Sequence, residues 1–270
     1  MSMQQKIIKY IALALAIGLA VSIIGGILGV IGLFGGFFGN DAVTEEMMFY
    51  GVKEDICSLN IEINAADITI KEGDTFSVES NLKNLHVTEK DECLNIVQTE
   101  KFRGSYKGAV LTVTVPSEIL ESITLKTGAG KFTAENLTTE RINFEFGAGE
   151  VSIDSLSATK SAHIEGGAGR VTISGGALHD LDMDMGVGEL SLTSALTGDC
   201  EMNLGVGESN IALLGDQDSY TLEIEKGIGA ISVDGEKAND YGSFGNGANE
   251  IEIHGGIGAI NITFKEAITK

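Results

Sequence analysis

Short stretches in which apolar and polar residues alternate recur along most of the chain. Apolar side chains occupy every second position at Ile142, Phe144 and Phe146, and again at Val151 and Ile153. Such alternation is typical of β-strands that bury one face. A Gly-X-Gly segment stands between two such strands, where the missing side chains let the backbone turn sharply. The pattern therefore predicts pairs of strands joined by glycine corners.

The Gly-X-Gly segment belongs to an internal repeat. It reads Gly128-Ala-Gly-Lys-Phe-Thr-Ala134 in the first clear copy, and the later copies start at residues 147, 167, 186, 205, 227, 247 (a degenerate copy) and 256. Successive starts lie 19, 20, 19, 19, 22, 20 and 9 residues apart. Two strands and two corners in about 20 residues match one coil of a β-solenoid. The predicted corner residues are Gly128, Gly130, Gly147, Gly149, Gly167, Gly169, Gly186, Gly188, Gly205, Gly207, Gly227, Gly229, Gly247, Gly256 and Gly258.

The fold expected from this repeat is all-β, a single-stranded parallel β-helix of about 20-residue coils. An antiparallel sandwich or barrel is the alternative, in which the same glycines would form hairpin loops. The near-constant repeat length favours the solenoid, because stacked coils must match in length. The residue after the second glycine favours it too, since stacking would place these residues about 4.8 Å apart. The first four alternate in charge and predict a ladder of ion pairs: Lys131, Glu150, Arg170 and Glu189, after which Glu208 breaks the alternation.

A long apolar segment precedes the repeats. Residues 10–38 contain no charged residue, and about 20 apolar residues suffice to span a bilayer as a helix. We predict a cytoplasmic N-terminus at residues 1–6 and a transmembrane helix at residues 7–38, because Lys6 and Lys9 lie at its start and Asp41 is the first acidic residue. A cleaved secretory signal is the alternative, although its apolar core would usually be shorter, about 7–15 residues. Glycines such as Gly25 and Gly29 would let two helices approach closely, or reflect the glycine content of membrane helices.

The rest of the chain is expected to lie outside the membrane as one domain. A linker at residues 39–55 leads to a β-solenoid domain at residues 56–265, and residues 266–270 form a tail. Within the domain, residues 56–116 carry looser strands and form irregular first coils or a cap, whereas residues 117–265 hold the regular repeats. Residues 64–70 resemble a worn copy of the repeat, and Pro116, the only proline, falls at a strand end, where a missing N–H is tolerated.

Composition excludes several classes of protein. The net charge of −21 argues against nucleic-acid binding, which needs a basic surface. Beyond the predicted helix, on its C-terminal side, all 39 acidic residues face only 18 − 2 = 16 basic ones, a net charge of −23. Three cysteines form at most one disulfide within the chain, which excludes a small disulfide-rich domain. Outside the cell, Cys57 and Cys93 are able to form a disulfide, although an odd number of cysteines disfavours one. Cys200 falls at an inward position that suits a small core residue.

The motifs of cofactor and metal sites do not fit this chain. The Gly-X-Gly copies have neither the third glycine of a dinucleotide fingerprint nor the Gly-Lys-Ser/Thr of a phosphate loop. The repeat is about twice as long as that of calcium-binding β-rolls. Four histidines (His86, His163, His179 and His254) lack metal-ligand spacing, and four coils are expected to separate His163 from His254. We predict no catalytic, cofactor-binding or metal-ligating residues.

Carbohydrate-active β-helix enzymes are the catalytic alternative. They need convergent carboxylates in a groove. The many acidic residues of this chain follow a period of two, which instead places them on the solvated face of strands: Asp180, Asp182, Asp184, Glu201, Glu223 and Glu225. The chain also has no tryptophan to stack on sugars. We therefore expect that the protein is not an enzyme.

Residues 111–117 (Leu-Thr-Val-Thr-Val-Pro-Ser) and 123–130 (Ile-Thr-Leu-Lys-Thr-Gly-Ala-Gly) resemble a known bacterial family. The chain looks like the "putative adhesin" family of β-strand-repeat proteins of unknown function over about residues 50–265. The resemblance implies an extracytoplasmic β-helical domain, often behind one N-terminal transmembrane helix, and in some members a place beside envelope-stress systems. It carries over no catalytic residues.

These observations together predict a single-pass membrane protein with a cytoplasmic N-terminus. Its outer domain would be a non-catalytic cell-surface scaffold, adhesin-like or associated with envelope stress. Its expected contacts are the membrane and protein partners or a second copy, whose surfaces could meet the flat sheets. Two alternatives remain, a β-helix carbohydrate-active enzyme and an accessory modulator that acts on a membrane sensor through its glycine-rich helix.

Overall fold

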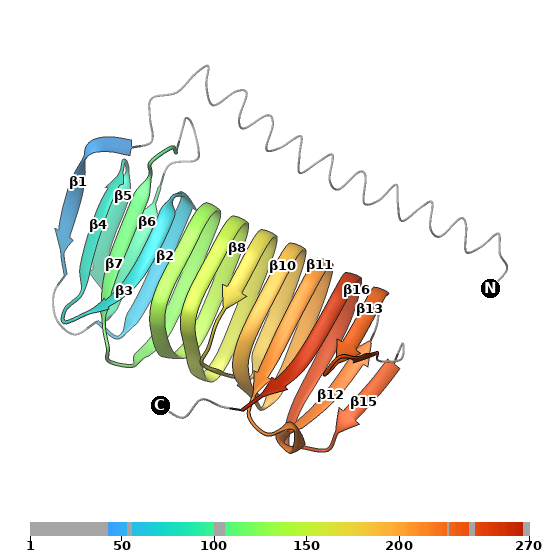
Figure 1. Ribbon diagram of the computed structural model, residues 1–270. Helices are drawn as coiled ribbons and strands as arrows, with labels where there is room; N and C mark the ends of the chain where they lie inside the picture. Colours follow the sequence, from blue (N-terminus) through green and yellow to red (C-terminus); the bar gives the residue numbers. More distant parts are fainter. Residues whose placement is uncertain (1–42, 53–55, 100–105, 226, 238–240, 267–270) are drawn as a thin grey trace. The chain divides into compact units, whose positions relative to one another are not determined.

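The computed structural model describes residues 43–52, 56–99, 106–225, 227–237 and 241–266. Contacts divide the chain into two units, Met1–Ala42 with Lys101–Lys107, and Val43–Glu100 with Gly108–Lys270. The first unit is described only at residues 106 and 107. The described residues of the second unit form one 16-stranded sheet and one short 3-10 helix, η1 (Gln217–Ser219) (Figure 1). The all-β prediction is therefore confirmed.

The regular repeats form stacked coils. Strands β8 (Leu120–Ile173), β9 (Ala177–His179), β10 (Leu181–Thr197) and β11 (Asp199–Leu214) pair side by side in parallel. The register keeps like positions together, so that Gly169 lies opposite Gly188, and Gly188 opposite Gly207. Hairpins would instead pair their strands antiparallel. Parallel pairing shifted by one repeat is the arrangement of a solenoid (Figure 1).

The C-terminal coils stack in an order that differs from their order in the chain. β12 (Tyr220–Glu225) and β13 (Ile228–Val233) follow β11 in sequence, but β16 (Asn249–Lys265) lies between them and β11. Gly258 of β16 lies opposite Gly207 on one side and Gly229 on the other. Two antiparallel strands, β14 (Glu236–Lys237) and β15 (Tyr241–Gly245), pair with β13 and β12. The last repeat copy therefore fills a place inside the stack.

The N-terminal end is also built out of chain order. β2 (Ser58–Ala65) and β3 (Asp67–Gly73) pair in parallel with β8, and the worn repeat copy is therefore a coil. β6 (Cys93–Gln98) and β7 (Val110–Pro116) stack outside them in parallel. β4 (Ser77–Leu82) and β5 (Leu85–Lys90) pair antiparallel with β7 and β6. Antiparallel strands thus flank the coils at both ends, and Pro116 ends β7 as expected.

The structure describes part of the predicted linker but not the predicted membrane segment. Part of the predicted linker at residues 39–55 is a strand, β1 (Val43–Gly51), which pairs antiparallel with β4. The predicted cytoplasmic residues 1–6 and transmembrane helix 7–38 lie outside the described residues. Among the residues that are described, no helix has the length and apolar character needed to span a membrane.

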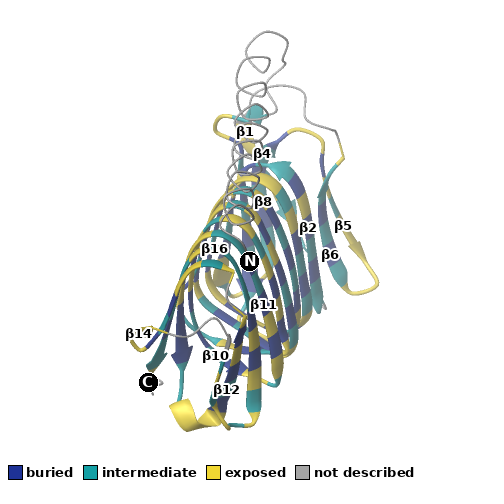
Figure 2. Ribbon diagram, turned by 90° about the vertical axis from the view of Figure 1, so that its right-hand side faces the viewer, coloured by how far each residue is buried: buried dark blue, intermediate teal, exposed yellow. Residues whose placement is uncertain are grey.

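Buried positions alternate with more exposed ones along the coils (Figure 2), and the buried apolar side chains form the core. Phe132, Phe144 and Phe146 pack against one another with ring centroids 5.6–6.1 Å apart. The hydroxyl of Thr139, which is fully buried, donates to the carbonyl oxygen of Leu120 at 2.9 Å, so its polar group is satisfied. Removal of one buried phenylalanine ring typically costs about 3–5 kcal/mol. This aromatic cluster therefore contributes to the core of the first regular coils.

Candidate functional site

The predicted corner glycines line up along one ridge across the stacked coils, here called the glycine ridge. The second glycine of each corner has a φ between 125° and 151°, a region that L-amino acids with side chains rarely adopt. A Cβ on Gly207 would also lie 1.6 Å from the carbonyl oxygen of Gly188 in the neighbouring coil. The glycine positions of the ridge therefore leave no room for a side chain. Its members are Gly128, Gly130, Gly147, Gly149, Gly167, Gly169, Gly186, Gly188, Gly205, Gly207, Gly256, Gly258, Gly227 and Gly229.

Gly247 lies away from this ridge and is a correction to the sequence-based assignment. Its amide donates to the carbonyl oxygen of Tyr220 at 3.2 Å, just before β16 begins. The strand that follows Gly247 is the first half of the coil whose corner is Gly256. The 9-residue spacing arises because the degenerate copy and the last copy belong to one coil.

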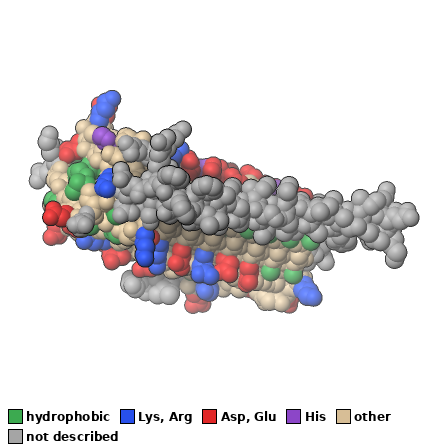
Figure 3. Space-filling view, turned by 90° about the horizontal axis from the view of Figure 1, so that it is seen from above, with side chains coloured by type: hydrophobic (Ala, Val, Ile, Leu, Met, Phe, Trp, Pro, Cys, Tyr) green, Lys and Arg blue, Asp and Glu red, His purple; other side chains and the backbone are tan. Residues whose placement is uncertain are grey.

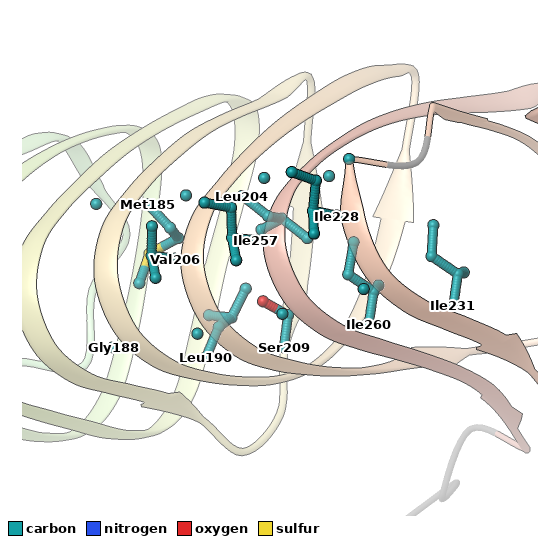
Figure 4. Close-up of a pocket in the computed structure, with 18 residues that line it drawn as sticks. Met185, Gly188, Leu190, Leu204, Val206, Ser209, Ile228, Ile231, Ile257 and Ile260 are labelled. Atoms are coloured by element: carbon teal, nitrogen blue, oxygen red, sulfur yellow. The ribbon is translucent and has the colours of Figure 1, made fainter. Parts of the chain in front are cut away.

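Two small cavities lie beneath the glycine ridge. The first is about 20 Å³ in volume and is lined by apolar side chains such as Leu204, Val206 and Ile257 together with ridge glycines (Figure 4). The second is also about 20 Å³ and lies beside Phe146 and Val171. Such a volume holds about one water molecule, whereas ligand pockets usually measure about 300–1,000 Å³. These two cavities therefore cannot take a cofactor or a sugar.

One outer wall of the C-terminal coils carries exposed carboxylates, here called the acidic face. Register places Asp182 opposite Glu201, and Glu252 between Glu201 and Glu223. Two like charges directly opposite each other disfavour strand pairing, and each such pair costs up to about 1 kcal/mol. Figure 3 shows acidic side chains gathered along one side of the unit. The members of the acidic face are Asp182, Asp184, Asp199, Glu201, Glu223, Glu225, Glu250 and Glu252.

Two histidines lie among these carboxylates. His163 Nδ1 lies 2.9 Å from Asp182 and its Nε2 lies 3.1 Å from Glu165. Partial burial opposes the charged imidazolium, but the hydrogen bonds to Glu165 and Asp182 outweigh it and hold the pKa of His163 above its ordinary value. A protonated His163 would therefore offset part of the negative charge at one edge of the acidic face.

His254 lies among the carboxylates of the acidic face. It lies 3.2 Å from both Glu225 and Glu252 and 3.8 Å from Glu201. The expectation that four coils separate it from His163 is wrong. Because β16 is inserted next to β11, only the β10 and β11 coils lie between the two histidines.

The opposite wall carries the predicted charge ladder. Lys131 lies 3.9 Å from Glu150, and Arg170 lies 3.7 Å from Glu150 and 2.7 Å from Glu189. The ladder prediction is confirmed, and Figure 3 shows alternating basic and acidic side chains along this side. The pairs are exposed, so each contributes little to stability. We infer that the ladder favours the correct register more than it stabilises the fold.

Two further ion pairs on the walls were not predicted from the sequence. Lys126 bonds Glu145 on the wall of the acidic face, and Lys160 bonds Glu140 at 2.6 Å. The partners lie 19 and 20 residues apart, which is one repeat. Alignment of the repeat copies position by position would have found both pairs.

Cys200 and the metal-ligating residue types add no further site. Cys200 is buried, 4% exposed, and its sulfur accepts a hydrogen bond from the amide of Leu181 at 3.4 Å, which confirms the predicted inward position. In the described part of the chain, no group of three or more His, Cys, Asp or Glu residues is arranged to hold a metal ion. The site that stands out is therefore a surface, the acidic face.

Comparison with known proteins gives one family match and several structural likenesses. The family model described as Toastrack DUF4097 matches residues 56–242. A "putative cell adhesion protein" from Clostridium sporogenes is 16% identical, with a TM-score of 0.41, over 82% of this chain and 99% of that one. A "putative adhesin" from Bacteroides fragilis is 15% identical, with a TM-score of 0.49, over 83% and 100%. Another from Parabacteroides distasonis is 13% identical, with a TM-score of 0.46, over 83% and 99%. No curated protein matches the chain.

Proposed function

The chain belongs to the Toastrack DUF4097 family, and from that premise we propose that it is a non-catalytic scaffold or adhesin-like interaction module at the cell surface. In this proposal a single-stranded parallel β-helix of about 20-residue coils stands outside the membrane on one transmembrane helix. Protein partners bind the acidic face. The charge-free run at residues 10–38 and the basic residues at its start support the anchor and its orientation.

The observation that supports binding at the acidic face most strongly is its row of like charges. Asp182, Glu201, Glu252 and Glu223 lie opposite one another on adjacent strands and are all exposed. Their mutual repulsion costs stability within the chain, whereas on the other wall the charges alternate from Lys131 to Glu189. A partner that presents basic side chains would relieve this repulsion on binding and would be attracted from a distance. The geometry therefore favours an electrostatically guided contact.

The same geometry disfavours the carbohydrate-active alternative. Acid–base hydrolysis needs two carboxyl groups that converge on one bond in different environments. The carboxylates of the acidic face follow one another along the wall, and Glu223, Glu225 and Glu252 line an open hollow of about 430 Å³ on it. Glu201 and Glu252 are each more than half exposed, so these groups share one solvated environment. A surface of this kind suits recognition better than the cleavage of a glycosidic bond.

Matched charge reversals test the proposed contact surface. Glu201→Lys with Glu252→Lys alters the acidic face, and Glu189→Lys with Glu208→Lys makes the same charge change on an adjacent pair of the opposite wall. Crosslinking in cells, followed by identification of the bound envelope proteins, is the measurement. We expect the acidic-face variant to lose partners that the wild type and the control variant retain. Equal partner sets for all three proteins, at equal surface levels, would contradict the proposal.

A further inference from the structure

Two of the three cysteines lie side by side near the N-terminal end of the solenoid. Cys57 immediately precedes β2, and Cys93 begins β6. These are adjacent parallel strands, in which Ser58 lies opposite Cys93. Neighbouring strands are about 4.8 Å apart and each residue rises about 3.3 Å, which separates the two cysteine Cα atoms by about 6 Å. Disulfides usually join Cα atoms about 4.4–6.8 Å apart.

Hydrogen bonds hold Cys57 against the start of β6. The amides of Cys57 and Ser58 both donate to the carbonyl oxygen of Glu92, at 2.9 and 3.2 Å. On its other side, the carbonyl oxygen of Cys57 accepts from the amide of Glu121 at 2.7 Å. The sulfur of Cys57 lies 3.6 Å from the carbonyl oxygen of Glu92, the residue before Cys93. The thiol of Cys57 therefore lies beside the strand that carries Cys93.

We propose that Cys57 and Cys93 are a redox-sensitive latch, which closes by forming a disulfide between the first coil and the layer stacked outside it. Both cysteines are partly exposed and free, whereas Cys200 is buried. Exposure gives an oxidant access to the pair, and the register sets the two Cα atoms within the range of a disulfide. The sulfur of Cys57 lies 4.0 Å from the hydroxyl of Ser58, the residue opposite Cys93. The latch does not depend on the function of the acidic face.

The closing reaction is ordinary thiol–disulfide exchange with a small disulfide as the oxidant. One cysteine thiolate attacks the reagent, forms a mixed disulfide and releases one reagent thiolate. The thiolate of the other cysteine then attacks the protein sulfur of that mixed disulfide and releases the second. Two protons leave the cysteine thiols, and two electrons reduce the reagent disulfide to two thiols. The protein gains one intramolecular disulfide.

The environment of the pair determines when the latch closes. Burial of the sulfur raises the pKa of Cys57, and the carboxylates of Glu92 and Glu121 raise it further against the opposing hydrogen bond of Ser58. Burial also raises the pKa of Cys93, and the negative charge of Cys57 adds to it. Because only the thiolate reacts, closure is slow at neutral pH and accelerates roughly tenfold per pH unit below the thiol pKa.

Closure ties together the segment that begins at Cys57 and ends at Cys93. This segment contains β2, β3, β4 and β5. The disulfide therefore links the coil that begins with β2 to the outer layer that holds β6, and it closes a loop that includes the antiparallel strands β4 and β5. A covalent loop of this length lowers the entropy of the unfolded chain. The latch therefore strengthens the end of the solenoid where β6 and β7 cover the first coil.

Thiol counting on the purified full-length chain in detergent tests the latch. The reduced protein is incubated with oxidised glutathione, denatured, alkylated and weighed. The wild type should keep one alkylated thiol out of three, carry no glutathione and remain monomeric on a non-reducing gel. Cys200→Ser should lose both of its thiols, whereas Cys57→Ser and Cys93→Ser should form no intramolecular disulfide. The oxidised wild type should also melt several degrees above the reduced form, and Cys57→Ser should show no such difference.

Three alkylated thiols in the oxidised wild type would overturn the proposal. A disulfide that involves Cys200 or joins two chains would do the same. An unchanged melting temperature after complete closure would show that the bond forms without acting as a latch. The thiol counts and the melting temperatures do not depend on whether a partner binds the acidic face.

Discussion

At the scale of single residues, the ridge shows why glycine is used so heavily. A side chain at Gly207 would meet the backbone of the neighbouring coil, and its φ of 148° is unfavourable for any other residue. The Gly-X-Gly spacing indicates corners. The contact with the next coil depends on the register between coils, which the local sequence does not contain.

The close backbone approach predicts a large cost for one methyl group on the ridge. Gly207→Ala should destabilise the solenoid by about 3 kcal/mol or more, through a strained φ and a clash with Gly188. Gly235→Ala is the control, because Gly235 also has a positive φ but nothing within 4 Å of its Cβ position. It should cost only about 1–2 kcal/mol. Urea unfolding measures both, and equal losses would contradict the steric argument.

The histidine at the edge of the acidic face predicts a pH-dependent contribution to stability. The pKa of His163 is raised in the folded state, so its stabilising effect is complete below its unfolded value of about 6.5 and is lost as pH rises through the folded pKa. The difference in melting temperature between wild type and His163→Gln should therefore be larger at pH 5.5 than at pH 8.5. A difference that grows with pH would refute this sign.

At the scale of elements, the structure corrects the stacking order. Period-two alternation identifies β16 as a strand but does not name its neighbours, because every coil shows the same pattern. One signal was present in the sequence. Gly227-Ile-Gly-Ala-Ile231 and Gly256-Ile-Gly-Ala-Ile260 are identical. Both have alanine (Ala230 and Ala259) after the second glycine, where the copies from Lys131 to Glu208 have a charged residue. The two segments lie side by side in the sheet.

The insertion of β16 predicts how the C-terminal end unfolds. β16 pairs with β11 on one side and with β12 and β13 on the other. A chain that stops at residue 248 should therefore lose hydrogen-exchange protection throughout β12 and β13, while β8 and β10 keep theirs. Removal of residues 267–270 alone should change nothing. Retained protection in β12 and β13 of the shorter chain would contradict the inserted position of β16.

At the scale of the whole molecule, charge is divided unevenly along the chain. Two basic residues precede the apolar run, and the rest of the chain carries a net charge of −23. The repeat predicted the all-β fold and the ion-pair ladder, because both follow from a constant period. The sequence did not predict that β16 would place His254 among Glu201, Glu225 and Glu252, since that neighbourhood depends on the stacking order.

Cysteine labelling in intact cells tests the central claim, an acidic solenoid displayed outside the membrane, most directly. In a background of Cys57→Ser and Cys93→Ser, one cysteine is placed at exposed Glu189 and, in a second protein, at Ser2. Buried Cys200 remains in both as an internal reference. A maleimide that cannot cross membranes should label Glu189→Cys in intact cells, and Ser2→Cys only after permeabilisation. Labelling of Glu189→Cys only after permeabilisation would contradict the account.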